Sequence, residues 1–382
     1  MDERWMADPV ECGTAAGFGI YVHIPFCAHR CGYCDFATYD DQHDWIPRYV
    51  AALRAEIARA GGSDRPVTSI FIGGGTPTLL PAHHLAGVVD LLHATFAVEV
   101  GAEVTVECNP ETASVELFER LAASGVNRVS MGAQSFAAEV LKTLERQHTA
   151  ERPLEAVAQA RQGGIDQVSL DLIYGTPGET NDDWEATLRQ AVIAEVDHVS
   201  AYALTIHDNT PFGRRVSQGT LARPDDDVQA DRFDTARDLL GAAGFEHYEI
   251  SNWAMGSRAR SRHNVLYWRH GDYLAFGVGA HGHRDGQRWW NPRAIAPYVT
   301  AVEERRDPAS GSEVLTPDER AEERLLLGLR LREGLHPVDV PPIDPLALED
   351  AIAHDLVQTS SGRLQSTEGG WFLLDEAIRR LT

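Results

Sequence analysis

The sequence predicts an α/β protein whose larger part is an incomplete (β/α)6 barrel, followed by an α+β extension and a small helical module. Three observations predict this fold. Short β-rich runs recur six times before residue 210, runs with apolar residues at three- and four-residue spacing separate them, and polar motifs follow the strands. Strands alternating with helices build parallel sheets. Six such units instead of eight indicate a barrel that does not close.

The expected strands come first along the chain. They are GIYVHI (19–24), SIFIG (69–73), EVTVEC (103–108), NRVSMG (127–132), QVSLDLI (167–173) and HVSAYAL (198–204). The clearest helical periodicity between them lies in WIPRYVAALRAEIARA (45–60), ASVELFERLAASG (113–125) and ATLRQAVIAEV (186–196). Gly125 is expected to end the second of these helices, because glycine readily adopts the left-handed conformation of a helix C-terminus.

The alternation stops near residue 210. The stretch RVSQGTLARPDDDVQADRF (215–233) indicates an exposed acidic segment that leads into a helix. Thr316-Pro-Asp-Glu319 forms a predicted capping box with proline at the first helical position, so a helix should begin there. We therefore expect a tail over 1–17, the barrel over 18–210, an extension over 211–310 and a C-terminal module over 311–382.

Charge and composition narrow the range of partners. The chain of 382 residues carries a formal net charge of -23, which argues against binding to nucleic-acid backbones or anionic lipid surfaces. The first residues lack the apolar region of a secretory signal, and no apolar run approaches the ~18 residues that cross a bilayer. We expect a cytoplasmic protein, in which clustered cysteines more often bind metal than form disulfides.

Three of the five cysteines lie in CAHRCGYC, directly after the first predicted strand: Cys27, Cys31 and Cys34. Thiolates are soft ligands that suit zinc or an iron–sulfur cluster. A structural zinc site wants four protein ligands, and His29, inside the same tight loop, is the candidate fourth. The ligand count favours a cluster. Cys12 and Cys108 stand alone and are expected to be small buried residues.

A [4Fe-4S] cluster held by three cysteines leaves one iron without a protein ligand. In this respect the sequence resembles the radical S-adenosylmethionine (SAM) superfamily, whose CxxxCxxC loop leaves that iron to the amino and carboxylate groups of the methionine part of SAM. The resemblance implies a [4Fe-4S] cluster and SAM as cofactors. It also implies an electron donor for the cluster.

The resemblance extends to motifs at the ends of the other strands: GGGTPT, the Glu of VECNP, SMGAQSF, LERQH and DLIYGTPGET. Each motif alone is compatible with a tight turn or a solvated side chain. Together they lie around one edge of the predicted barrel, where such folds carry their chemistry. By resemblance, the SAM-binding residues are Tyr21, Tyr33, Gly75, Thr76, Glu107, Gln134, Arg146 and Asp171.

From about residue 18 to the C-terminal module, the sequence resembles one branch of this superfamily, the oxygen-independent coproporphyrinogen dehydrogenases (HemN) and the HemW haem chaperones. The dehydrogenase has a further cysteine two residues after the third and a long N-terminal extension. This chain has Phe36 at that position and about twenty residues before the first strand. HNVLYW (263–268) matches the HNxxYW motif of the HemW group. Phe36, the short segment before the first strand and the HNVLYW motif all favour the chaperones.

The resemblance places haem at His263, Asn264, Tyr267 and Trp268, with His263 as a candidate iron ligand and the aromatic rings against the porphyrin. Residue types alone favour a core histidine beside packed aromatic rings. His247, His270 and His281 are alternative iron ligands. His207 departs from the family, since relatives usually carry an acidic residue there.

These observations imply a haem chaperone on a radical SAM scaffold, which binds haem and passes it to a haem protein. Candidate acceptors include respiratory, membrane-bound proteins, and such a partner would bring this protein to the periphery of the membrane. A homodimer is a candidate assembly. Catalytic residues are left unassigned. The alternatives are an oxygen-independent coproporphyrinogen III dehydrogenase and a radical SAM enzyme that acts on another tetrapyrrole.

Overall fold

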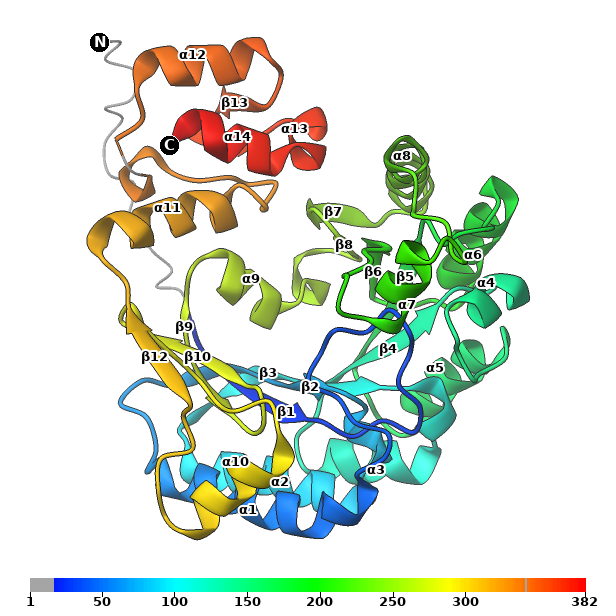
Figure 1. Ribbon diagram of the computed structural model, residues 1–382, viewed down its shortest axis with the longest axis vertical. Coiled ribbons are helices and arrows are strands. Elements are labelled where there is room, and N and C mark those ends of the chain that lie inside the picture. The colour runs from blue at the N-terminus through cyan, green and yellow to red at the C-terminus, as the bar shows by residue number, and fades with distance from the viewer. Residues whose placement is uncertain (1–16, 341) are drawn as a thin grey trace.

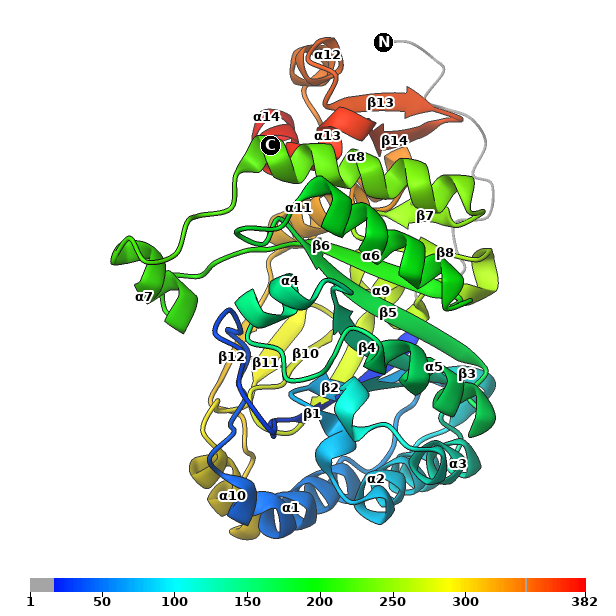
Figure 2. The ribbon, with the colours of Figure 1, turned by 90° about the vertical axis from the view of Figure 1, so that its right-hand side faces the viewer.

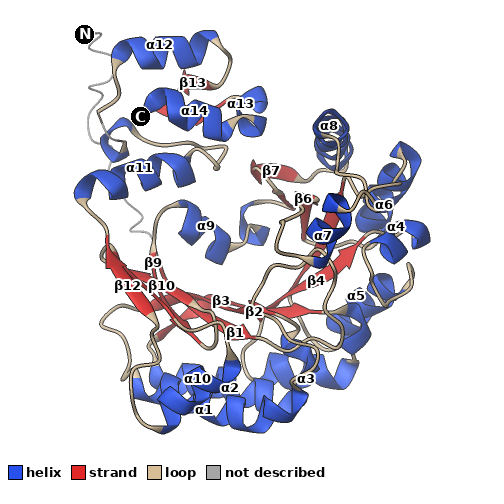
Figure 3. Ribbon diagram, viewed as in Figure 1, coloured by secondary structure: helices blue, strands red, loops and turns tan. Residues whose placement is uncertain are grey.

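The computed structural model describes residues 17–340 and 342–382, and its core is a large, mostly parallel sheet (Figures 1 and 3). Cys12 and nearly all of the expected tail lie outside the described residues. All six predicted strands are present, and each pairs in parallel with the next. They are β1 (Phe18–Ile24), β2 (Val67–Gly74), β3 (Val98–Cys108), β4 (Arg128–Gln134), β5 (Gln167–Tyr174) and β6 (His198–Ala203). The predicted α/β fold is confirmed.

Helices cover the convex face of this sheet (Figure 1). They are α1 (Ile46–Arg59), α2 (Ala82–Thr95), α3 (Val115–Ala123), α4 (Ala138–Thr143), α5 (Arg152–Gln162) and α6 (Asn181–Ile193). Side chains cap the starts of two of them, α3, where Ser114 accepts the N–H of Leu117, and α6. In α6, Thr180 and Asp183 form a capping box that satisfies two backbone N–H groups at the helix start. At the end of α3, Gly125 has φ +99°, one residue beyond the cap, as its predicted role requires.

The sheet is wider than six strands. On the side of β1 it continues with β9 (Asp272–Phe276), which is parallel to β1, and then with antiparallel β10 (His281–Arg284), β11 (Gln287–Trp290) and β12 (Gly311–Val314). Beyond β6 it adds antiparallel β8 (Asn252–Ala254) and β7 (Glu246–Glu249). The segment expected as an α+β extension therefore supplies strands to both edges of the barrel sheet.

Four helices accompany these added strands: α7 (Pro211–Ser217), α8 (Asp226–Ala242), α9 (Arg262–Trp268) and α10 (Ile295–Glu303). The acidic segment leads into α8 as predicted, and Asp225 caps that helix by accepting the N–H of Val228. Helix α9 lies on the concave side of the sheet, opposite α1–α3, and contacts β1 and β2 (Figure 1). This position makes α9 part of the barrel interior.

The C-terminal module begins with α11 (Pro317–Gly328), and the predicted capping box of Thr316 and Glu319 is present. It continues with α12 (Pro345–Ala353), β13 (Val357–Ser360), β14 (Arg363–Ser366), α13 (Glu368–Phe372) and α14 (Leu374–Leu381). The module is thus helical with one added hairpin, and it packs around its own apolar cluster. Figure 2 shows α8 beside it, where Phe233 contacts Phe372 with ring centroids 4.6 Å apart.

Single 3₁₀ turns connect several of these elements: η2 (His43–Trp45), η3 (Pro77–Leu79), η4 (Pro110–Thr112), η5 (Ser257–Ala259) and η6 (Pro337–Asp339). No helix among the described residues is long and apolar enough to cross a membrane.

Alternation along the strands separates the apolar core from the polar interior. In β3, Val104 and Val106 are buried in the main core, whereas Glu103, Thr105 and Glu107 alternate with them. Successive side chains of a strand point to opposite faces, so the polar set faces the concave side. The same alternation in β4 places Val129 toward the helices and Ser130 inside. The barrel interior is consequently lined by polar side chains.

Candidate functional site

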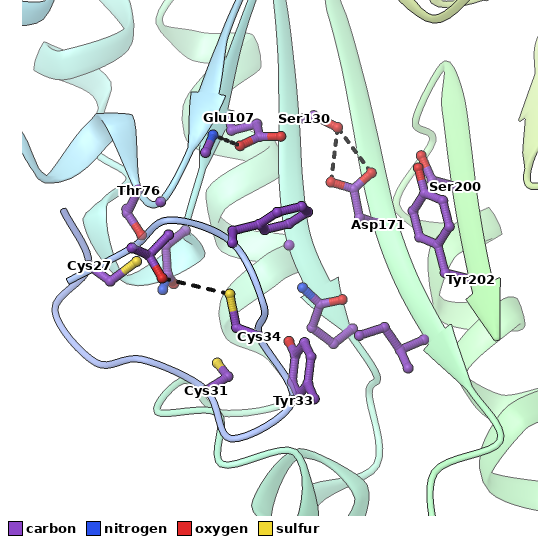
Figure 4. Close-up of a pocket in the computed structure, with 18 of the residues that line it drawn as sticks. Cys27, Cys31, Tyr33, Cys34, Thr76, Glu107, Ser130, Asp171, Ser200 and Tyr202 are labelled. Carbon is purple, nitrogen blue, oxygen red and sulfur yellow. Dashed lines mark hydrogen bonds between the residues drawn. The ribbon is translucent and has the colours of Figure 1, made fainter. Parts of the chain in front are cut away.

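A cavity of about 740 Å³ opens at the carboxyl ends of the parallel strands. Its walls are the cysteine loop after β1, the glycine segment after β2, the ends of β3–β6 and the first residues of α9. Figure 4 shows the three cysteines on one side and Asp171, Ser200 and Tyr202 on the other. This size lies within the range of small-molecule sites in proteins.

Cys27, Cys31 and Cys34 all line this cavity. Among the described residues, no three His, Cys, Asp or Glu side chains converge on a position that would hold a single metal ion. A cubane cluster instead distributes its cysteine ligands over separate irons, which lie at different corners. The donor set therefore fits a [4Fe-4S] cluster with three protein ligands.

The cysteine loop is anchored by the buried side chain of His23 on β1. Its Nε2 lies 3.0 Å from the carbonyl oxygen of Ala37, so Nε2 carries the proton. The Tyr21 hydroxyl then donates to Nδ1 at 2.9 Å. Burial lowers the pKa of His23 to about 4, which keeps the ring neutral in this role. Tyr21, which was expected near SAM, is therefore placed to support the loop and is not among the residues that line the cavity.

Positive charge and hydroxyl groups adjoin the sulfur atoms. Arg146 Nη1 lies 3.6 Å from Cys31 Sγ, and its Nη2 donates to the carbonyl oxygen of Gly132 at 2.9 Å. Burial raises the pKa of Cys27 to about 11, and the Thr76 hydroxyl acts in the opposite direction. A buried thiolate needs such compensation or a metal. The loop environment is thus suited to hold anionic sulfur once iron is bound.

The glycine segment leaves room beside the cysteines. A Cβ on Gly73 would lie 2.7 Å from the Glu107 carboxylate, and one on Gly74, whose φ is +109°, would lie 2.4 Å from the His23 ring. The Glu107 carboxylate accepts the Gly74 N–H at 2.8 Å. Side chains at these positions would collide with the residues that shape the cavity. The glycines are required for close backbone approach.

Two acidic residues face each other across the polar wall. Burial, with a smaller contribution from the nearby Asp171 carboxylate, raises the pKa of Glu107 to about 7. Asp171 accepts a hydrogen bond from Ser130 Oγ at 3.0 Å to each carboxylate oxygen, and burial raises its pKa too (Figure 4). These carboxylates can accept hydrogen bonds from amino or hydroxyl groups and favour a cationic ligand such as a sulfonium.

Seven of the eight residues expected to bind SAM line the cavity: Tyr33, Gly75, Thr76, Glu107, Gln134, Arg146 and Asp171. Gln134, expected just past β4, is its last residue and has φ +63°, at an irregularity in the pairing with β5. Such a conformation in a non-glycine residue is held by its surroundings and is common at functional sites. The structure brings these residues together, and their contacts with SAM stay a prediction.

The residues expected to contact haem are divided by the fold. His263 is 1% exposed, and its Nδ1 and Nε2 lie 3.0 and 2.9 Å from the hydroxyls of Ser69 and Tyr267. The Trp268 ring packs beneath Arg330, with the guanidinium carbon 4.1 Å from its centroid. Only Asn264 lines the cavity. Iron ligation by His263 stays a prediction that would require it to release one hydroxyl.

The alternative histidines also lie away from the cavity. His247 stacks on Trp253 at 4.2 Å, His270 pairs with Glu323 on α11, and His281 stacks on Trp290. In contrast, His207 and His29 line the cavity, and His207 Nε2 lies 3.6 Å from the Asp35 carboxylate in the cysteine loop. The His207 imidazole can therefore approach the Asp35 carboxylate, whereas an acidic side chain at position 207 would be repelled by it.

Sequence reasoning missed Arg128, His198, Ser200 and Tyr202, which line the cavity from β4 and β6. His198 Nδ1 lies 2.7 Å from Ser169 Oγ and its Nε2 lies 2.9 Å from the Tyr248 hydroxyl, so it joins three strands. The available signal was the polar alternation in RVSMG and HVSAYA, which marks these side chains as facing away from the helices.

Replacing Glu107 by Gln should make stability depend less on pH. The pKa of Glu107 in the folded protein is about 7, above its ordinary value of 4.5. The unfolding free energy therefore falls as pH rises between these two values, because the unfolded chain loses the Glu107 proton more easily than the folded protein does. We expect Glu107→Gln to gain roughly 1 to 3 kcal/mol over the parent at pH 8 and almost nothing at pH 4. Denaturant unfolding without ligands measures this difference. For Glu116→Gln, on the exposed face of α3, the difference in unfolding free energy from the parent should be the same at pH 4 and pH 8. If the difference for Glu107→Gln were equally independent of pH, the raised pKa of Glu107 would be contradicted.

Comparisons with known proteins agree with the geometry. The sequence matches the radical SAM superfamily over residues 21–191 and the HemN C-terminal domain over residues 315–373. It is 42% identical to the haem chaperone HemW of Mycobacterium tuberculosis, covering 95% of this chain and 94% of that protein, and 32% identical to HemW of Bacillus subtilis, covering 94% and 97%.

The solved structure of coproporphyrinogen III oxidase (HemN) from Escherichia coli is similar in fold. It has a TM-score of 0.81, with 23% sequence identity, and the match covers 96% of this chain and 90% of that one. At this identity the likeness shows a shared fold.

Proposed function

Because this chain belongs to the HemW family within the radical SAM superfamily, we propose that it is a haem chaperone, which binds haem and passes it to haem proteins. The observation that carries the proposal is the 42% identity to a curated HemW along nearly the whole chain. The cavity supports it, because three cysteines and seven of the expected SAM-binding residues meet there.

Cys27, Cys31 and Cys34 would hold the [4Fe-4S] cluster, and when bound the cluster can supply an electron to the sulfonium of SAM. The protein's own residues orient and balance charge. Arg146 would offset the negative charge of the thiolates, while the carboxylates of Glu107 and Asp171 would accept hydrogen bonds from SAM. The backbone of the glycine segment allows that ligand to approach closely.

The dehydrogenase alternative has less support. Its fold is shared, but Phe36 occupies the position of the further cysteine that the resemblance assigns to the dehydrogenase. The Phe36 ring is 62% exposed, and it stands at the cavity wall. An apolar side chain there cannot supply a thiolate. It offers an aromatic surface instead, which suits a flat apolar ligand better than additional metal chemistry.

The proposal is tested with the full chain, reconstituted without oxygen. We expect haem titration to give a saturable absorbance change at about one haem per chain, and no protoporphyrinogen when coproporphyrinogen III, SAM and an electron donor are supplied. Absence of haem binding would contradict the chaperone proposal. Robust decarboxylation would replace it with the dehydrogenase.

The same titration addresses His263. If His263 ligates haem iron, His263→Ala should weaken the absorbance change, and Tyr267→Phe should strengthen it, because the phenylalanine ring leaves Nε2 without its hydroxyl partner. If His263 is only a core residue, both variants should lose folding stability and keep the affinity for haem. An unchanged spectrum in folded His263→Ala would exclude it as the iron ligand.

A further inference from the structure

Arg128, the first residue of β4, lines the cavity together with Ser261 and Asn264 at the start of α9, and we call these three residues the cavity floor. Its backbone is fixed by side chains from two strands, β3 and β7. Glu103 accepts the N–H groups of Arg262 and His263 at 2.9 and 3.1 Å, and the Tyr248 hydroxyl accepts that of Ser261 at 3.2 Å. The first N–H groups of α9 are therefore already used by the protein. The floor must bind a ligand through its side chains.

Arg128 is the charged group of the floor. The residue is 2% exposed, and its Nη1 donates to Gln167 Oε1 at 3.0 Å and to the carbonyl oxygen of Ala259 at 2.9 Å. No hydrogen-bond partner for its Nε or Nη2, and no carboxylate oxygen within 4.0 Å of its guanidinium, is found among residues 17–340 and 342–382. The Asp171 carboxylate, whose pKa Arg128 acts to lower, is the charge that interacts with it from beyond that distance, and a buried cation without an ion partner in contact is costly. Because Arg128 lines the cavity, a ligand can supply the partner.

Asn264 adds neutral polar groups to the same floor. Its backbone N–H is bonded to Ser261 Oγ at 3.3 Å, but its side-chain amide has no hydrogen-bond partner in the described part of the chain. It lines the cavity together with the hydroxyl-bearing Ser200 and Tyr202. The amide is therefore available to a ligand. This gives the second residue of the HNVLYW motif a role distinct from that of the buried His263.

We propose that Arg128 and Asn264 form a subsite for a carboxylate at the floor of the cavity. Arg128 supplies a planar pair of donors, which suits a carboxylate, and the Asn264 amide can donate to the same group. A dianion such as phosphate fits less well, because Arg128 is the one cation of the floor and Asp171 lies in the same wall. The favoured ligand is a singly charged carboxylate.

The subsite deepens the proposed function and rests on it. By the family resemblance, the carboxylate of SAM goes to the cluster beside the cysteine loop. The floor is then left to a second ligand. Haem carries two propionates, and one of them has the chemistry that Arg128 and Asn264 can recognise.

Asn264→Asp tests this assignment without removing a contact. Asn264 is the third residue of α9, where a carboxylate is favourable to the helix, so folding should be preserved. In the cavity, however, the new negative charge would repel a propionate and occupy the free donors of Arg128. We expect the affinity for haem to fall about tenfold or more, as for the loss of one charged hydrogen bond.

Two controls sharpen the result. Asn181→Asp makes the same change in the first turn of α6, outside the cavity, and should leave haem binding unchanged. Haem dimethyl ester lacks free carboxylates; it should bind the parent more weakly than haem does, and Asn264→Asp should not weaken it further. Arg128→Gln, which keeps a neutral donor toward Ala259, should behave like Asn264→Asp.

The outcomes separate the two proposals. If the parent protein fails to bind haem, the chaperone proposal fails and the subsite fails with it. The carboxylate subsite is overturned, while the chaperone proposal stands, under two joint conditions. The parent, Asn181→Asp and Asn264→Asp would have the same affinity for haem, and the parent would bind haem dimethyl ester as tightly as haem. Should Arg128→Gln not fold, Asn264→Asp still decides, because the Asn264 side chain has no partner to lose.

Discussion

Replacing any one of Cys27, Cys31 and Cys34 by Ala is expected to abolish stoichiometric iron and sulfide. With three protein ligands the cluster already has one iron without a cysteine, so a further loss leaves two irons without protein thiolates. The loop gives no replacement donor, since no other cysteine lies within it. Iron and acid-labile sulfide analysis after reconstitution without oxygen, together with the visible absorbance of the cluster, measures the loss.

Cys12→Ala is the matched control and should retain both iron and sulfide. A lone divalent ion in the parent protein, bound by side chains alone and without sulfide, would remove the basis of the cofactor assignment. Retention of four irons and four sulfides in Cys31→Ala would show that this residue is not a ligand. It would also question the role of Arg146, whose Nη1 lies 3.6 Å from that sulfur.

Replacing Arg232 by Ala is expected to cost about 3–5 kcal/mol of unfolding free energy. Arg232 on α8 forms an ion pair with Glu179 at 2.5 Å and also donates to the Glu179 carbonyl oxygen; the two side chains are only 6% and 0% exposed. The Glu179 carboxylate in turn accepts the N–H groups of Gly175 and Thr176, in the loop that follows β5. The pair therefore joins α8 to the edge of the sheet that bears the cavity.

Removing one partner leaves a buried charge, which is the reason for the large effect. Burial raises the pKa of Glu179 to about 7 even beside Arg232, so the unpaired carboxyl in the variant should take up a proton more readily. The deficit should consequently shrink at pH 5. Denaturant unfolding at pH 5 and pH 8 measures both quantities.

Arg189→Ala is the matched control, because Arg189 pairs with Glu185 on the exposed surface of α6 and should contribute less than about 1 kcal/mol. The double variant Glu179→Leu/Arg232→Met should recover much of the stability by replacing the charges with apolar groups. Equal effects of Arg232→Ala and Arg189→Ala would show that the buried pair does not hold α8.

The sequence predicted the parts of the molecule that have a short-range signal. Periodic strands and helices, the capping box at Thr316 and Glu319, and the glycine after α3 each depend on neighbours within a few residues, and all are present. The spacing of Cys27, Cys31 and Cys34 is also local, and it identified the loop that lines the cavity. Polar motifs at strand ends predicted a shared edge, because parallel strands end together.

An α+β extension was predicted, but the positions of its strands and their pairing with the barrel sheet were not, because these strands are short and gain their stability from pairing with distant segments. Strand β9 pairs with β1 across some 250 positions of sequence, as in the register of Phe18 with Asp272. Burial of the haem motif was likewise undecided. The sequence HNVLYW does not show that His263 meets Ser69 on β2, whereas Asn264 reaches the cavity.

By itself, then, the sequence determined the six-stranded barrel, its cysteine loop and the family of the chain, since these depend on residue type and spacing. Tertiary structure decided which side chains share the cavity, which histidines are enclosed, and that Arg128 keeps donors without a protein partner. Those properties depend on contacts between segments far apart in the chain. Pairing of polar groups in a buried interior is settled only when every neighbour is in place.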